Sequence, residues 1–168
     1  MPLTTIENTP SNEESDKAND TKTKGNGEMN ELVIAGVSIK TGEIKKIELP
    51  MPPLYTDTHM SIPVYVHRGK KPGPCLFVSA AIHGDELNGI EIVSRLISSK
   101  SIKSLRGTLI AVPMVNVYGV LNQSRYLPDR RDLNRSFPGS KKGSLAGRIA
   151  NIFLTEIVSK CDYGIDLH

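Results

Sequence analysis

Short apolar runs, separated by polar positions and turn signals, occupy residues 31–70. Ile62, Val64 and Val66 recur with a period of two, which predicts a β-strand. We therefore expect residues 31–70 to form a short antiparallel β-rich leader. Residues 1–30 contain few apolar positions, without a period, among many Asn, Thr, Ser and charged residues. Such a segment cannot bury enough surface to offset its ordering entropy, so we expect a disordered tail.

The pattern changes after residue 70. Residues 75–82 and 108–115 are continuous apolar runs bounded by turn residues, which is typical of strands buried on both faces. Between them, residues 86–98 carry apolar side chains at helical spacing. Strand, helix and strand in this order predict a βαβ unit. The expected class is α/β, with a mostly parallel twisted sheet flanked by helices over residues 71–168.

A long polar loop is expected over residues 116–143, a length that is usually functional or disordered. Ser144 then caps a helix with a single apolar face. Residues 163–168 begin another strand, and the sequence stops there.

Composition and charge narrow the classes of function. The net charge of +3 comes from scattered lysine pairs without interleaved aromatic residues, so nucleic acid is not an expected partner. We find no apolar run long enough to span a membrane and no signal peptide, so a cytoplasmic protein is expected. Cys75 and Cys161 each lie beside an apolar run and are interpreted as free thiols, because a disulfide framework needs more cysteines.

Three residues have the types and positions of metal ligands. His83 and Glu86 lie where the first buried strand meets its helix, and His168 ends the last strand. The carboxyl ends of parallel strands share one edge, and catalytic zinc usually takes about three protein ligands. On spacing alone, zinc binding has no advantage over two structural interpretations. His83 would then simply be a histidine at a strand end, and Glu86 a glutamate at the start of a helix. Asp166 is either a partner of His168 or a solvated acid.

Four arginines are concentrated between residues 125 and 139. The adjacent Asn134 and Arg135 form a good pair for one carboxylate, because a guanidinium fork matches a carboxylate. The alternative is a solvated loop with local Arg–Asp pairs, and composition alone favours it.

Three motifs together resemble the succinylglutamate desuccinylase/aspartoacylase family, which has the zinc carboxypeptidase-like fold. The resemblance covers roughly residues 62–168 and matches in order and spacing. The motifs are His83-Gly84-Asp85-Glu86, Asp132-Leu133-Asn134-Arg135-Ser136-Phe137-Pro138-Gly139 and Ile165-Asp166-Leu167-His168.

The resemblance implies one zinc ion per chain, held by the three residues His83, Glu86 and His168. It implies that Asn134 and Arg135 bind a substrate carboxylate. It also implies an arginine that polarises the scissile carbonyl; Arg125 matches best, with Arg130 or Arg131 as substitutes because this segment is slightly longer here. The implied reaction is hydrolysis of an acyl amide or ester by zinc-activated water.

The sequence departs from the family at its end. Family members continue past the third ligand, and the general-base glutamate lies in that continuation. We therefore expect an α/β domain that is incomplete at its C-terminus, a poor catalyst alone, and a site completed by a further region or a second polypeptide. The expected substrate is a small carboxylate-bearing molecule such as an N-acyl amino acid. The alternatives are a zinc carboxypeptidase acting on peptides and an inactive zinc-binding remnant.

Overall fold

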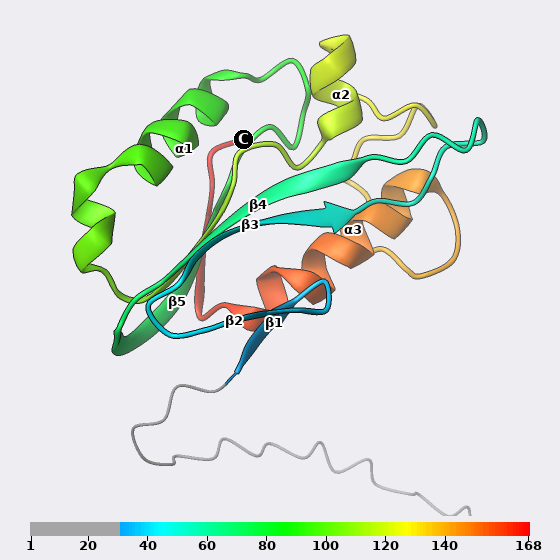
Figure 1. The fold of residues 1–168 in the computed structure, drawn as a ribbon. Helices are drawn as coiled ribbons and strands as arrows, with labels where there is room; N and C mark the ends of the chain where they lie inside the picture. Colours follow the sequence, from blue (N-terminus) through cyan, green and yellow to red (C-terminus); the bar gives the residue numbers. More distant parts are fainter. Residues whose placement is uncertain (1–30) are drawn as a thin grey trace, which may run out of the picture.

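The computed structural model describes residues 31–168, and the predicted tail of residues 1–30 lies outside the described part (Figure 1). A five-stranded sheet forms the centre, in the order β3-β4-β6-β5-β7. A two-stranded hairpin lies apart from it. The strands are β1 (Leu32–Ile34), β2 (Val37–Ile39), β3 (Ile44–Pro50), β4 (Ser61–Arg68), β5 (Lys71–Ser79), β6 (Arg106–Val112) and β7 (Tyr163–Asp166). The helices are α1 (Asn88–Ser98), α2 (Val117–Asn122) and α3 (Leu145–Glu156), with 3₁₀ turns η1 (Lys100–Ser104) and η2 (Val158–Lys160).

The sheet is flanked by helices, as predicted, but it is mixed. Strand β5 pairs in parallel with both β6 and β7, whereas β4 pairs antiparallel with both β3 and β6. Half of these four pairings are therefore antiparallel, so "mostly parallel" overstates the parallel share. The cause is that β3 and β4 belong to the main sheet. The predicted separate leader is reduced to the β1–β2 hairpin, because alternate side chains of β4 enter the same core as β6.

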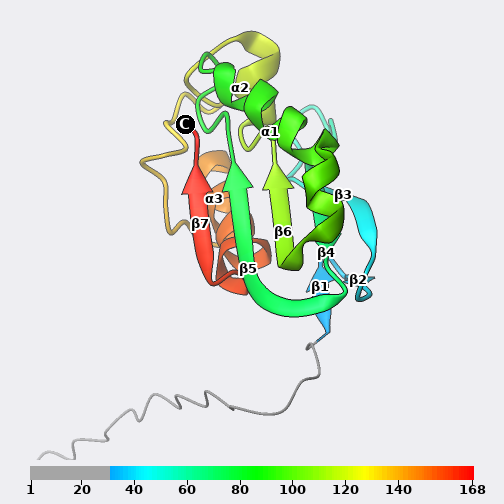
Figure 2. The same cartoon turned by 90° about the vertical axis from the view of Figure 1, so that its left-hand side faces the viewer.

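Helices cover both faces of the sheet. Helix α1 lies on one face and α3 on the other, as Figures 1 and 2 show from two directions. Val93 of α1 packs with Val78 and Leu109 in one hydrophobic cluster. Ile149 and Phe153 of α3 belong to a larger cluster on the other side. The two clusters hold β5 and β6 between them and fix the strand ends that carry the candidate site.

Several predicted boundaries move by a few residues. Strand β5 starts at Lys71, four residues before the apolar run, because Lys71 already pairs with Arg106. It ends at Ser79, and Ala81 then adopts a left-handed conformation with φ 51°. Helix α1 begins at Asn88 rather than residue 86. The predicted loop contains α2, and the predicted cap of α3 is present, with Ser144 Oγ accepting from Gly147 N at 3.1 Å.

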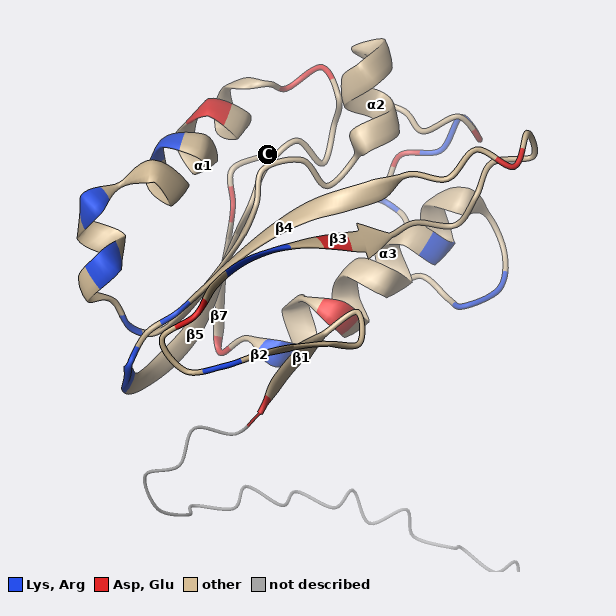
Figure 3. Ribbon diagram, viewed as in Figure 1, with Lys and Arg blue, Asp and Glu red and all other residues tan. Residues whose placement is uncertain are grey.

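Basic side chains are distributed over several elements, including α1 and β3 (Figure 3). Among residues 31–168, no helix combines the length and the apolar character needed to cross a membrane.

Candidate metal centre

Two parallel strands deliver the three predicted ligands to one edge of the sheet. His83 and Glu86 follow β5, and His168 follows β7, its parallel neighbour. The bond from Leu167 N to Ser79 O, 2.9 Å, extends the pairing to the end of the described chain. One ligand atom from each of the three residues lies within 4.8 Å of the others. His83 is fully buried, Glu86 is half-buried and His168 is exposed.

The turn that carries His83 and Glu86 is held tightly against α2. A Cβ atom on Gly84 would lie 1.8 Å from the carbonyl carbon of Gly119, so only glycine fits at this position. Gly84 N donates to Ser124 O at 3.0 Å, and Glu86 N donates to His83 O at 3.3 Å. The glycine between the two ligands is therefore a packing requirement of the turn.

The imidazole of His83 is fixed on both sides. Its Nε2 lies 3.0 Å from Asp132 Oδ1, and its Nδ1 lies 3.2 Å from Glu86 Oε1. Each of these carboxylates can only accept, so either ring nitrogen can donate to its neighbour; with a metal ion on Nδ1, the proton would lie on Nε2, toward Asp132. Burial raises the pKa of Asp132, but the hydrogen bond from His83 and the charge of Arg125 outweigh it and lower that pKa.

His168 is oriented in a similar way from β7. Its Nδ1 lies 3.1 Å from Asp166 Oδ2, while Ser79 Oγ donates to Asp166 Oδ1 at 2.8 Å. Its Nε2 lies 4.0 Å from Glu86 Oε2. Asp166 therefore contacts His168, which is the placement expected for a partner of a ligand. The supporting serine had no signal in the sequence.

The donor set fits zinc in type, and His83 with Glu86 fits it also in spacing. Two imidazole nitrogens and a carboxylate are common zinc ligands, and bonds of about 2.0–2.1 Å place tetrahedral ligand atoms roughly 3.3 Å apart. His83 Nδ1 lies 3.2 Å from Glu86 Oε1, which matches that value, whereas His168 Nε2 lies 4.0 Å from the other oxygen, Oε2, and would have to approach. Each histidine also has an acid on its other nitrogen, which is how metal-bound imidazoles are usually oriented. His83, Glu86 and His168 can therefore hold one zinc ion.

Arg125 is the arginine that reaches this group. Its Nη1 lies 3.3 Å from Glu86 Oε1, and its Nε lies 3.4 Å from Asp132 Oδ2. The fully buried Asn116 holds the backbone of this region, because its Nδ2 donates to Ile82 O at 3.3 Å and to Arg125 O at 3.5 Å. Its Oδ1 also accepts from Gly119 N at 2.8 Å, where α2 begins. Sequence reasoning assigned no role to Asn116.

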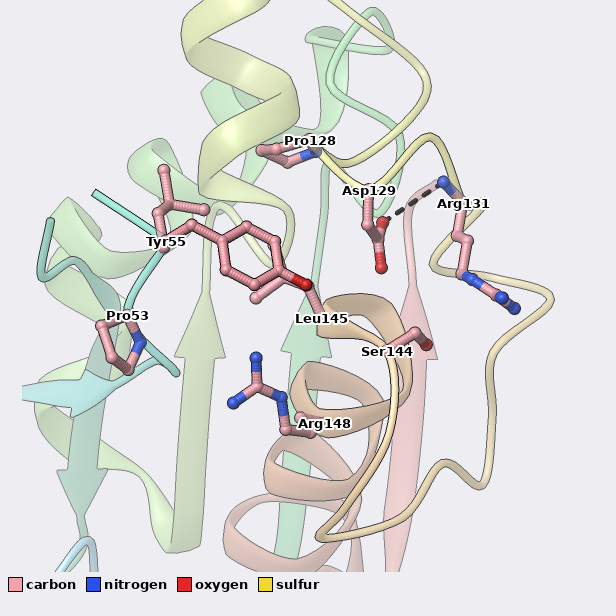
Figure 4. Close-up of a pocket in the computed structure, with 9 residues that line it drawn as sticks. Pro53, Tyr55, Pro128, Asp129, Arg131, Ser144, Leu145 and Arg148 are labelled. Carbon is pink, nitrogen blue, oxygen red and sulfur yellow. Dashed lines mark hydrogen bonds between the residues drawn. The ribbon is translucent and has the colours of Figure 1, made fainter. Parts of the chain in front are cut away.

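The substitute arginines lie elsewhere. Arg131 lines a separate pocket of about 300 Å³ with Tyr55, Asp129 and Arg148 (Figure 4). Arg130 is exposed, with φ 60°. The placement therefore favours Arg125 over both for a role beside the metal.

Asn134 and Arg135 are tied to the group only through their backbone. Asn134 N donates to Asp132 Oδ1 at 2.9 Å, and Arg135 N donates to Asp132 O at 3.2 Å. Within residues 31–168 no hydrogen bond joins either side chain to the three candidate ligands. Arg135 is exposed and Asn134 half-buried. Asp132 links this loop to His83. It belongs to the second sequence motif, which predicted no role for it.

The strand ends of an α/β fold thus bring together a His–Glu–His group, which is a candidate metal centre, and an adjacent arginine. Residues 72–168 match the succinylglutamate desuccinylase/aspartoacylase catalytic domain. Because this match covers more than half of the chain, the protein belongs to that family.

Individual relatives agree with this assignment. The chain is 38% identical over 109 residues to N-alpha-acetyl-L-2,4-diaminobutyric acid deacetylase of Halomonas elongata. The match covers 64% of this chain and 31% of that protein.

Solved structures show the same fold. An aspartoacylase family protein of Mesorhizobium loti superposes with a TM-score of 0.68 at 30% identity, over 77% of this chain and 41% of that one. The product-bound ectoine utilization protein EutE (DoeB) of Ruegeria pomeroyi also gives 0.68 and 30%, over 76% and 40%. The chain thus spans about a third to two fifths of the length of these relatives.

Proposed function

We propose that this chain carries the metal-binding half of a zinc-dependent deacylase that hydrolyses an acyl amide or ester bond in a small carboxylate-bearing substrate, such as an N-acyl amino acid. The observation that carries the proposal is the convergence of His83, Glu86 and His168, whose ligand atoms lie within 4.8 Å of one another. When bound there, zinc would supply a Lewis acid and lower the pKa of a coordinated water toward about 7.

The residues around the group support distinct tasks. Asp132 and Asp166 orient the two imidazoles through their outer nitrogens. Arg125 holds a guanidinium beside Glu86, where it can stabilise the negative charge that develops on a carbonyl oxygen. Asn134 and Arg135, on the loop anchored by Asp132, are proposed to bind the substrate carboxylate.

The substrate class rests on relatives. The Halomonas relative is named a deacetylase of an N-acetylated diamino acid, and the family name refers to removal of succinyl and other acyl groups from amino acids. We carry this class over as a proposal, with N-acyl amino acids as first substrates to test. Cleavage of peptides at their C-terminus is the competing activity.

The proton acceptor is proposed to come from a further segment or a second polypeptide. The carboxylates of Glu86, Asp132 and Asp166 are all engaged with histidine or arginine. A general base within hydrogen-bond reach of the water contributes typically about 10²–10⁴ in rate. Activity of the 168-residue chain alone is therefore expected to be weak.

Metal content tests the centre of the proposal. The purified chain should bind about one zinc ion, measured by elemental analysis after dialysis. His83→Ala should bind less than about a tenth of that amount, since the buried ligand is lost. His59→Ala is the control, because His59 is exposed and pairs with Asp57. Full zinc retention in His83→Ala would exclude this metal site.

Activity tests the substrate class separately. Zinc-loaded protein should release acetate from N-acetyl amino acids. It is assayed alone and with a separate polypeptide that contains the region of a longer family member beyond the part matched by this chain. Faster release of C-terminal residues from peptides would support the carboxypeptidase alternative. Zinc binding without turnover in either mixture would support the inactive remnant.

A further inference from the structure

The two cysteines meet at the opposite end of the sheet from the metal ligands. Cys75 lies on β5, and Cys161 follows η2, just before β7. Their sulfur atoms are 3.4 Å apart although 86 positions separate them in sequence. Both thiols are free and half-buried.

Backbone contacts hold the two cysteines in place. Asp162 N donates to Cys75 O at 2.8 Å, and Cys75 N donates to Asp162 Oδ2 at 2.8 Å. These two hydrogen bonds hold Asp162, the residue next to Cys161, against Cys75. A disulfide needs a sulfur separation of about 2.05 Å, so the two sulfur atoms, 3.4 Å apart, would have to approach each other further.

A pocket gives solvent access to one of the thiols. Cys75 lines a pocket of about 540 Å³ together with Arg68, Lys160 and Asp162. The hydrogen bond from Cys161 and the charge of Arg68 lower the pKa of Cys75, against burial and Asp162. The pKa of Cys161 is raised, first through the same hydrogen bond and then by burial. Cys75 therefore has the lowered pKa and is the member of the pair that lines this pocket, and thiolates are the reactive form.

A metal role does not explain the pair. Within residues 31–168, His83, Glu86 and His168 are the one group of three or more potential His, Cys, Asp and Glu ligands close enough to hold an ion. The two cysteines have no third potential ligand within that range. Formation of a disulfide, by contrast, requires only the two thiols.

We propose that Cys75 and Cys161 form a peroxide-sensitive dithiol site, at which hydrogen peroxide converts the two thiols into a reversible intramolecular disulfide. The Cys75 thiolate attacks one peroxide oxygen, the O–O bond breaks, and hydroxide leaves, giving a sulfenic acid on Cys75. Cys161 then attacks that sulfur, its proton joins the departing hydroxide, and water leaves as the S–S bond forms. The sum is two thiols and one peroxide giving one disulfide and two waters.

The bond would tie the middle of β5 to the segment just before β7. Strand β7 is the edge strand that leads to Asp166 and His168. Closing a loop of this length restricts the unfolded chain strongly. We expect the oxidised protein to melt about 5–10 °C higher than the reduced protein.

The test uses the full chain and hydrogen peroxide as the probe. Near-stoichiometric peroxide should reduce the titratable thiols from two per chain to none, and dithiothreitol should restore both. Non-reducing peptide mapping should show Cys75 linked to Cys161, with the protein still monomeric in size on a denaturing gel. Loss of thiols that dithiothreitol does not restore, links between chains, or two remaining thiols would each overturn the proposal.

Two controls separate folded geometry from general thiol reactivity. Disulfide closure in denaturant should be at least about tenfold slower, because the thiols lose their high effective concentration. An equal rate in denaturant would count against a built site. Cys161→Ser should accumulate a sulfenic acid on Cys75 that dimedone traps, whereas Cys75→Ser should leave Cys161 unreacted. Trapping on Cys161 in the second variant would reverse the assigned roles and overturn the mechanism.

Discussion

At the scale of single residues, Asp132 connects the loop that carries Asn134 and Arg135 with the three candidate ligands. It lies 3.0 Å from the outer nitrogen of His83 and also contacts Arg125. Asp132→Asn keeps the shape but removes the charge that favours a donating Nε2, so zinc affinity should fall about 10–100-fold. Competition with a chromophoric chelator measures this change. Asp129→Asn is the matched control, since Asp129 caps Ala146 N on the same loop, and its affinity should stay within about twofold of the original.

The residues of the site differ in how far sequence could find them. His83, Glu86 and His168 were identifiable because they follow apolar runs and match a motif, and parallel strand ends bring such positions together. Asp132 and Asn116 were not assigned, because their roles depend on how residues 116–143 fold back over the turn, which no local pattern encodes. The resemblance already preferred Arg125 and kept Arg131 as a substitute; the structure adds that Arg125 lies beside Glu86, whereas Arg131 lines a separate pocket.

At the scale of elements, Glu156 fastens the β1–β2 hairpin to α3. Its Oε2 accepts from Ala35 N at 2.9 Å and from Lys160 Nζ at 3.0 Å, and the first of these bonds is the main cause of its lowered pKa. A lowered carboxyl pKa contributes stability above the unfolded pKa of about 4.3 and loses it as pH falls through the folded value. Glu156→Gln should therefore reduce the free energy of unfolding by about 1 kcal/mol at pH 7.

That difference should shrink between pH 7 and pH 3 as the Glu156 carboxylate takes up a proton. Urea unfolding at the two pH values measures it. Glu91→Gln is the control, because Glu91 forms an ion pair with Arg95 whose side chains are 64% and 80% exposed. Its effect should stay below about 0.5 kcal/mol at either pH. A pH-independent effect of Glu156→Gln would show that the carboxylate charge does not hold the hairpin.

The sequence predicts whether a segment forms a helix or a strand better than it predicts which sheet a strand joins. The βαβ unit and the Ser144-capped helix follow from periodicity and capping, which are local. The position of β3 and β4 in the main sheet does not follow from local patterns. A strand with alternating apolar residues and one buried face can pair within a small hairpin or join a larger sheet. The pairing of β4 with β6 joins residues 40 to 46 positions apart, and packing decides it.

At the scale of the whole molecule, β7 is an exposed edge of the sheet. Among the described residues β7 pairs only with β5, and all four of its residues are exposed, with Tyr163 66% and Ile165 49% accessible. An edge with unpaired backbone groups and apolar side chains is a template for another strand. We expect the 168-residue chain to self-associate between roughly 1 and 100 µM under reducing conditions, as sedimentation velocity would show.

Ile165→Lys should weaken this association by at least about tenfold, because a lysine on an edge strand disfavours pairing through its charge and hydration. Leu121→Lys provides the comparison: Leu121 is 67% exposed on α2, away from the edge, and its replacement should leave association unchanged. If both substitutions had the same effect, general surface hydrophobicity would explain the association. If the original chain remained monomeric throughout the range, β7 would not act as a pairing edge, and the segment proposed to complete the site would have to bind elsewhere.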